Sequence, residues 1–436
     1  MLVRALTITV AWMVLCSACD KADHENIDKW TRTQKGPGKL KKALADEDLD
    51  PDLSAHAGAN LVKMTQDNEV RAALERMSPG RRTQVISKLA PRLWDIARIE
   101  SETNLPNPPQ VMAKDALVNL RKSADEAQRK QIDGYLIDWY AVSSYEARAG
   151  VGANLGAAVI RLLGPPAGKK LMAVANSVIA APGQDKVKNR IGDELLLGLA
   201  ASADPEAVKY VLDLVNMDRG DATLGKRSMS ALYKTFVDPG GLFDIASPEP
   251  LAAHLDAIVA VAKDDAQPGQ VINDAVALIR AVGAPACLTP LLGMVRVPHK
   301  ESRFKYVAAF NALKCGGAKS IVEVIRALPD TGAYVRDELQ GSISGEIAKM
   351  APRDQVQAAL RELLEDQSTI ARWVALEALA TMKSTEDAPR IAALSRSKER
   401  LTGYWGERNP EGKPDPTLGE RAKELAGQLG GAADAK

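Results

Sequence analysis

The sequence predicts an all-α fold, for three reasons. The chain has 436 residues, more than the roughly 250 to 300 over which a single hydrophobic core keeps growing. Aromatic residues make up only 4% of it, whereas β-sheets are enriched in aromatic and β-branched side chains. Apolar residues also recur at helical spacing, in units of similar length. An elongated helical repeat is therefore expected.

Residues 371–395 show the repeating unit most clearly. One apolar face is formed at spacings of three and one by Ala371, Val374, Ala375, Ala378, Leu379 and Met382. The polar turn KSTED follows, and Pro389 then stands where the first turn of a helix tolerates proline. The pattern predicts two helices joined by a short turn.

The same pattern recurs upstream. Its further copies are residues 53–77, 193–215, 272–295 and 303–328. Aligning Val282, Leu313, Met350 and Met382 gives steps of 31, 37 and 32 residues, a period typical of stacked helical pairs. The units resemble HEAT repeats over about residues 40–395. This resemblance implies a right-handed α-solenoid of roughly nine stacked HEAT-like helical pairs, each stabilised by its neighbours.

The remaining segments supply connections and ends. Residues 79–120 predict two helices broken at NLPNPPQ, and SADE at 123–126 predicts a capping box that opens a helix running through residue 148. Trp30 is expected to cover the first repeat, and Thr417 with Glu420 to cap a final helix. The predicted domains are a signal peptide, a tether with an N-terminal cap, the repeat solenoid, and an aromatic loop with a capping helix, at 1–18, 19–38, 39–395 and 396–436.

The N-terminus has the layout of an export signal. A basic start ending at Arg4 precedes an apolar run, residues 5–15, too short to span a bilayer. Small residues then precede Cys19, and the whole resembles the bacterial lipoprotein signal, with Cys16 where leucine is usual. The resemblance implies a lipid (palmitate-type acyl chains) on Cys19, and hence a lipid-anchored protein of the bacterial envelope that faces the periplasm or the cell surface. Asp20 after this cysteine is a signal for inner-membrane retention in some bacterial groups. A plain secretory signal or an uncleaved anchor is the alternative, and both still export the chain.

Two features of an exported chain stay open. Cys287 and Cys315, 28 residues apart, would meet an oxidising compartment, and either a disulfide or two buried free thiols fits the spacing. Tyr404 and Trp405 lie in a Gly- and Pro-rich loop. They either dock on the last repeat as its cap or form an exposed partner-binding loop.

The charge and the glycines argue against nucleic-acid and nucleotide binding. The chain has 57 basic residues, and Arg4 is the one that lies in residues 1–18. Without these residues, 56 basic and 56 acidic side chains balance each other. Phosphate binding, in contrast, needs clustered positive charge. A dinucleotide site would need an acidic residue some 20 positions after Gly150, Gly152 and Gly156, and none stands there.

The histidines suggest no metal site. The four of them are scattered, at His24, His56, His254 and His299. Deoxyhypusine hydroxylases, an enzyme family of this fold, hold iron with repeated His-Glu pairs, but only His24-Glu25 forms such a pair here. We therefore expect no catalytic residue, cofactor, metal or small-molecule substrate.

The expected function is a membrane-tethered, non-enzymatic scaffold that binds protein partners on the solenoid surface and is held at the membrane by the lipid on Cys19. Two alternatives remain. One is an enzyme or an accessory subunit of an envelope enzyme, of the HEAT-like phycobilin-lyase type. The other is a purely structural envelope spacer, which would need no specific binding patch.

Overall fold

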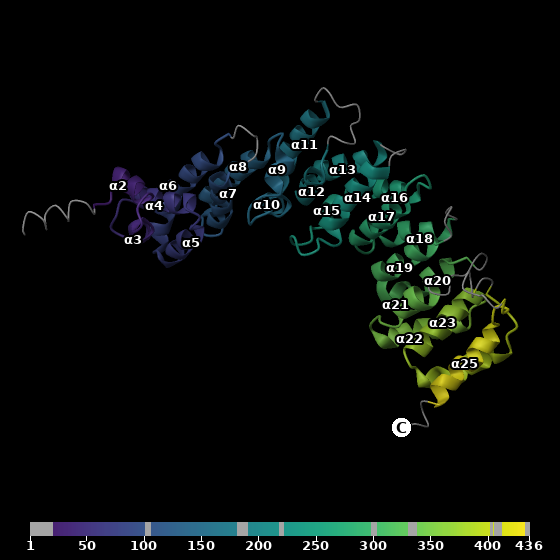
Figure 1. Ribbon diagram of the computed structural model, residues 1–436. Coiled ribbons are helices and arrows are strands. Elements are labelled where there is room, and N and C mark those ends of the chain that lie inside the picture. The colour runs from purple at the N-terminus through teal and green to yellow at the C-terminus, as the bar shows by residue number, and fades with distance from the viewer. Residues whose placement is uncertain are drawn as a thin grey trace, which may run out of the picture. The chain divides into compact units, whose positions relative to one another are not determined.

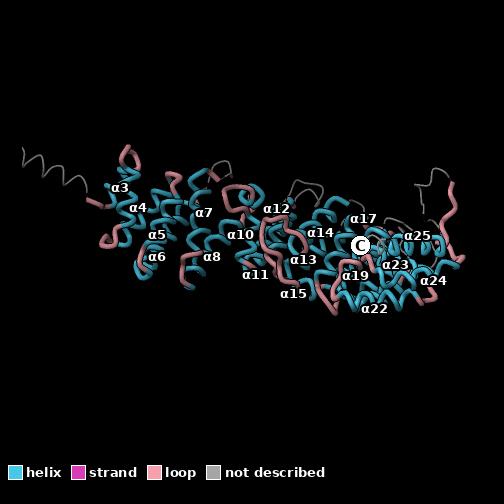
Figure 2. Tube along the Cα trace, turned by 90° about the horizontal axis from the view of Figure 1, so that it is seen from below, coloured by secondary structure: helices cyan, strands magenta, loops and turns pink. Residues whose placement is uncertain are grey.

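The computed structural model describes residues 21–100, 106–180, 191–217, 222–297, 303–329, 338–401, 404 and 412–431. Within these ranges every regular element is a helix, and β-type pairing is limited to one isolated bridge between Arg400 and Thr417. In Figure 2 the described residues are helices (cyan) joined by loops (pink), and none of them is drawn as a strand. The predicted all-α class is confirmed.

The described helices fall into two compact units, divided between Ala207 and Val208. Unit 1 contains α2 (His24–Trp30), α3 (Gly36–Ala45), α4 (Pro51–Lys63), α5 (Asp67–Arg76), α6 (Pro79–Ala97), α7 (Pro108–Arg121), α8 (Glu126–Tyr140), α9 (Tyr145–Ala149), α10 (Gly156–Leu163), α11 (Pro165–Ala180) and α12 (Asp193–Ala201). Helix α13 (Pro205–Met217) crosses the division.

Unit 2 continues the all-helical pattern. It contains α14 (Ala222–Phe236), α15 (Glu249–Ala252), α16 (Leu255–Lys263), α17 (Gly269–Ala281), α18 (Leu288–Arg296), α19 (Phe304–Gly316), η2 (Gly317–Ser320), α20 (Ile321–Ala327), the π-helical η3 (Glu338–Ser344), α21 (Gly345–Ile347), α22 (Arg353–Leu364), α23 (Thr369–Thr381), η4 (Thr385–Asp387), α24 (Ala388–Ala393), η5 (Leu394–Arg396) and α25 (Leu418–Gly431).

Each helix contacts mainly its near neighbours along the chain. In unit 1, α4 packs on α3 and α6, α6 packs on α7, and α7 packs on α8, an order that Figure 1 shows within that unit. The seams between these helices are filled by fully buried side chains such as Leu44, Leu61 and Leu89, each contributing about 1.5 to 3 kcal/mol. The core is thus distributed along the chain.

Several local predictions are confirmed. The unit at 371–395 forms α23 and α24, with proline in the first turn of α24. Asp204 caps α13 by accepting hydrogen bonds from the backbone N–H groups of Glu206 and Ala207, both at 3.0 Å. The Thr417–Glu420 capping box is present, at 3.0 and 2.7 Å.

The capping box predicted at 123–126 is wrong by two residues. Asp125 is the N-cap, and Gln128 closes the box. Its helix, α8, also ends at Tyr140 and not at residue 148, because the chain bends before the short helix α9 begins at Tyr145.

Candidate functional site

A groove of about 510 Å³ lies in unit 1, where α4, α6 and the start of α7 meet. Its lining combines apolar, cationic and polar side chains. They are His56, Ala59, Lys63, Arg92, Asp95, Ile96, Ile99, Asn107, Pro109 and Gln110.

The groove offers an apolar anchor beside positive charge. Ile99 lines the groove and is 56% exposed, so it could be covered by an apolar side chain of a partner. Lys63 is exposed and Arg92 half-buried, while Asp95 is paired with Arg98 at 2.8 Å. An apolar group next to a carboxylate would complement this lining.

The start of α7 adds no anion site to the groove. Pro108 and Pro109 occupy its first two positions and have no N–H to donate. The next N–H, of Gln110, is taken by the side chain of Asn107 at 3.2 Å. Recognition in the groove therefore depends on side chains.

A pair of histidines adjoins the groove. The Nδ1 atom of His24 on α2 lies 2.8 Å from the Nδ1 atom of His56 on α4, and the two rings are tilted by 33° with centroids 5.0 Å apart. His56 belongs to the groove wall. The contact joins residues that are 32 positions apart in the sequence.

Each histidine also faces a carboxylate of the other helix. His56 Nε2 lies 2.8 Å from Asp28 Oδ1, and His24 Nε2 lies 3.4 Å from Asp52 Oδ2. Asn60 donates to the same Asp28 oxygen at 3.0 Å. We name Asp28, His56, His24 and Asp52 the His–Asp cluster.

Arg92 links the His–Asp cluster to the groove. Its Nη2 lies 2.9 and 2.8 Å from the two carboxylate oxygens of Asp52. Partial burial alone would raise the pKa of Asp52, but this hydrogen bond and the charge of Arg92 outweigh it and leave the pKa lowered. Asp52 is therefore held as a carboxylate.

The pKa of His56 is lowered, chiefly because burial disfavours the charged ring. Asp28 works in the opposite direction, while Arg92 and His24 lower the His56 pKa further. Partial burial alone would raise the pKa of Asp28, but Asn60 and His56 outweigh it, so this pKa is lowered too.

The cluster is poorly arranged for general base catalysis. A catalytic base needs a free ring nitrogen within reach of the substrate, and both nitrogens of His56 are engaged, by Asp28 and His24. Among the described residues, the groove lining contains no Ser, Thr or Cys that could act as a nucleophile. The arrangement suits binding better than bond cleavage.

Sequence reasoning treated the histidines as scattered and missed this cluster. A signal was present: His24 and Asp28 stand four residues apart on α2, as do Asp52 and His56 on α4, and residues at this spacing share one helix face. The crossing of α2 and α4 pairs each histidine with the other helix's aspartate.

The other predicted site residues lie elsewhere. Cys19 and Trp405 are outside the residues that the structure describes. Tyr404 is described and is only 3% exposed, with its ring centroid 5.5 Å from that of Trp373 on α23. The Tyr404 ring therefore packs against α23 and is not presented at the surface.

The glycine-rich segment at 150–156 folds onto a buried ion pair. The side chain of Lys114 is 0% exposed, and its Nζ lies 2.7 Å from Asp115 Oδ1. Nζ also donates to the carbonyls of Val151 and Asn154, at 3.0 and 2.7 Å. Asp115 accepts from the backbone N–H groups of Ala153 and Asn154, at 2.7 and 3.0 Å. These bonds give the segment a structural role.

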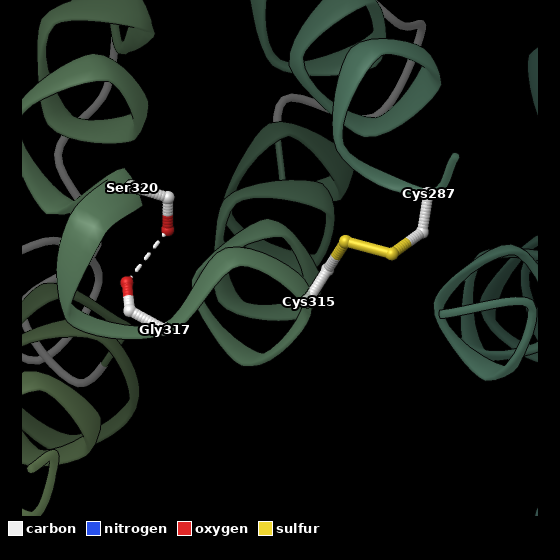
Figure 3. The surroundings of a disulfide bond; sticks show 4 residues. All are labelled: Cys287, Cys315, Gly317 and Ser320. Carbon is white, nitrogen blue, oxygen red and sulfur yellow. Dashed lines mark hydrogen bonds between the residues drawn. A yellow bond between two sulfur atoms is a disulfide. The ribbon is translucent and has the colours of Figure 1, made fainter. Parts of the chain in front are cut away.

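Cys287 and Cys315 form a disulfide, which settles the open alternative. Figure 3 shows the two side chains meeting, from the start of α18 and the last turn of α19, with Cα atoms 6.3 Å apart. Nearby, the Ser320 hydroxyl donates to the carbonyl of Gly317 at 2.8 Å.

Wider comparisons add no family assignment: no protein-family model matches the chain, and no curated protein matches it. Among the described residues, no three side chains of His, Cys, Asp or Glu are arranged to hold a metal ion. The described helices also include none that combines the length and apolar character needed to cross a membrane.

Proposed function

We propose that this protein is a lipid-tethered, non-enzymatic scaffold of the bacterial envelope, and that the groove of unit 1 is a docking site for a protein partner. The observation that carries the proposal is the exposed Ile99 beside Lys63 and Arg92 in an open groove of about 510 Å³. A partner segment with an apolar side chain next to an acidic one would bury Ile99 and pair with the two cations.

The finer architecture that we propose is an α-solenoid of HEAT-like pairs. The preference of each helix for neighbours one to three places away, within each unit, supports it, because repeats of this kind bury their apolar faces only against adjacent repeats. Such an arrangement leaves long helix surfaces free for binding.

Export to the envelope has its own support. A disulfide between Cys287 and Cys315 fits an oxidising compartment, since cytosolic reductants keep most thiols reduced. The lipid itself would be carried by Cys19. Several acyl chains on one cysteine would give stable attachment, where a single chain gives only reversible binding.

The groove also bears on the two alternative functions, a structural spacer and an enzyme. A spacer needs no open groove with an exposed isoleucine, and an enzyme that used His56 would need one of its ring nitrogens free. Binding is therefore the function that the groove supports best.

Site-specific photo-crosslinking in the native membrane tests the proposal. A crosslinker at Ile99 should give one discrete protein adduct, and Lys63→Glu should abolish it. The same crosslinker at Leu242, an exposed apolar residue of unit 2 (43% exposed), should not give that adduct. Identical adducts from both positions, or an adduct that survives Lys63→Glu, would overturn the docking site.

A separate experiment tests the tether. Cys19→Ser should move the protein from the membrane fraction to the soluble fraction, and mass spectrometry of the wild-type N-terminus should show acyl mass on Cys19. A wild-type N-terminus without acyl mass would refute lipidation, and it would leave the groove proposal standing.

A further inference from the structure

The hydrogens of the His–Asp cluster can be assigned from its contacts. A carboxylate only accepts hydrogen bonds, so the 2.8 Å contact between His56 Nε2 and Asp28 Oδ1 needs a hydrogen on Nε2. A neutral imidazole carries a single N–H, which leaves a lone pair on His56 Nδ1. The hydrogen in the 2.8 Å contact between the two Nδ1 atoms therefore belongs to His24.

This assignment leaves His24 Nε2 without a hydrogen, 3.4 Å from Asp52 Oδ2. In the neutral state a lone pair thus faces a carboxylate, which is unfavourable. A proton on Nε2 would make His24 a cation and turn the contact into an ion pair. The His24 side chain is 55% exposed, so a proton can reach it from solvent. We expect the cluster to take up its first proton at this atom.

A second proton has no comparable place. The lone pair that remains on the two rings is that of His56 Nδ1, which accepts from His24. A hydrogen on this atom would point at the hydrogen of His24, so the rings would have to separate. Burial also lowers the pKa of His56, and the charges of Arg92 and His24 lower it further, against the effect of Asp28. The pair thus accepts one proton with its contacts intact.

The charged groups around the two rings come from three helices. Helix α2 contributes Asp28, α4 contributes Asp52 and Lys63, and α6 contributes Arg92 and Lys88. Helices α3, α5 and α7 also pack on α4, and among the described residues their ion pairs lie outside the cluster. These pairs are Lys41–Glu69, Lys114–Asp115 and Arg121–Asp133.

Proton uptake would change the charge beside the groove. Arg92 lines the groove and holds Asp52 through its Nη2 atom, at 2.9 and 2.8 Å. A protonated His24 adds one positive charge and pairs with the same Asp52 carboxylate. Because Asp52 would then divide its attraction between two cations, Arg92 would be held less tightly and could pair with a carboxylate of a partner.

We propose that His24 and His56 form a one-proton switch that strengthens the binding of an acidic partner segment in the groove as the pH falls. This inference rests on the proposed docking site. Histidine side chains change charge between about pH 5 and 8, and coupled rings take up protons as a pair. By linkage, a bound acidic segment would in turn favour the protonated pair.

Nuclear magnetic resonance of the imidazole groups tests the switch without a partner. The full chain carries Cys19→Ser, which keeps it free of lipid, and His24→Ala and His56→Ala assign the signals. From about pH 8 to 5, both rings should respond with one midpoint, as His24 becomes charged and His56 stays neutral. His24→Ala should raise the midpoint at which His56 itself binds a proton by about one pH unit. Separate midpoints in the wild type, or a His56 midpoint that His24→Ala leaves unchanged, would overturn the switch.

Photo-crosslinking at Ile99, in native membranes suspended at each pH, tests the effect on the groove. With the partner limiting, the adduct should increase about fivefold from about pH 8 to 6. It should stay nearly level with His24→Ala and increase as in the wild type with His254→Ala, in unit 2. A wild-type yield that does not rise, or an equal rise with His24→Ala, would overturn the regulation and leave the docking site standing. If no adduct forms at any pH, the docking site and its regulation both fail, and the resonance titration still decides the one-proton pair.

Discussion

Replacing Gly152 by alanine should destabilise unit 1 strongly. The backbone of Gly152 has φ of +89°, a conformation that costs a residue with a Cβ about 1 to 3 kcal/mol. The new Cβ would also lie 2.4 Å from Asp115 Oδ2 and 2.9 Å from Lys114 Nζ, too close for either atom to stay in place.

Besides the backbone strain, the substitution would disturb the buried ion pair of Lys114 and Asp115, on which the segment of Gly152 packs. Moving the Asp115 carboxylate would break or lengthen its hydrogen bond from the backbone N–H of Ala153, now 2.7 Å. A hydrogen bond to a charged group contributes about 1.5 to 3 kcal/mol. Together with the backbone strain, we expect a loss of about 3 to 5 kcal/mol in the free energy of unfolding of this region.

Gly134 provides the matched control with the opposite sign. It lies inside α8, is exposed, and has open space where a Cβ would stand. Alanine there should stabilise by about 1 kcal/mol, because glycine is a poor helix former. Urea unfolding, with hydrogen exchange of peptides from α7 to α10, measures both changes. A Gly152→Ala protein within about 0.5 kcal/mol of wild type, inside the range of neutral surface changes, would refute the reasoning.

Three further predictions concern buried pairs and the disulfide. Lys114→Met should lower the free energy of unfolding in urea by about 3 to 5 kcal/mol, because it leaves the buried Asp115 without its cation. Lys209→Ala, which removes an exposed i,i+4 ion pair, should lower it by under about 0.5 kcal/mol. Equal losses would contradict the burial argument. Cys315→Ser should cost about 3.5 kcal/mol, from a crosslink spanning 28 residues, and a reductant should lower the melting temperature of wild type but not of this variant. Burial alone would raise the pKa of Asp387, but Arg361 helps hold this pKa below the ordinary value. Unfolding therefore takes up a proton, and unit 2 loses stability as the pH falls below about 4. Asp387→Asn should make the urea midpoint depend less on pH in this range, and an unchanged slope would show that the pair does not contribute.

Local features of the fold could be predicted because their partners are close in the sequence. The Thr417–Glu420 capping box needs only residues three apart, and proline in the first turn of α24 needs only its own backbone geometry. The capping box of α8 was misplaced for the same reason. Ser123 with Glu126 and Asp125 with Gln128 both fit the motif, and the choice depends on where the apolar face of the helix must point.

The sequence contained only one signal of the candidate site, the spacing of four residues between each histidine and an aspartate of its own helix. The site itself depends on how the helices cross. His24 and His56 are brought together by the packing of α2 on α4, and nothing in the spacing of 32 residues encodes that contact. The ion pair of Lys114 and Asp115 was likewise hidden, since two adjacent charged residues in a helix usually face solvent. The sequence allowed either a disulfide or two free thiols at Cys287 and Cys315. The distance between their Cα atoms, which decides between the two, follows from the packing of α18 on α19.

The position of α2 in the chain has a consequence for the His–Asp cluster. With the lipid on Cys19 that we propose, only residues 20–23 separate it from the start of α2 at His24. Four residues span at most about 14 Å when fully extended, comparable with one to two Debye lengths at physiological ionic strength. The negative surface potential of anionic lipids extends through this layer, so the composition of the leaflet would change the electrostatic environment of the His–Asp cluster.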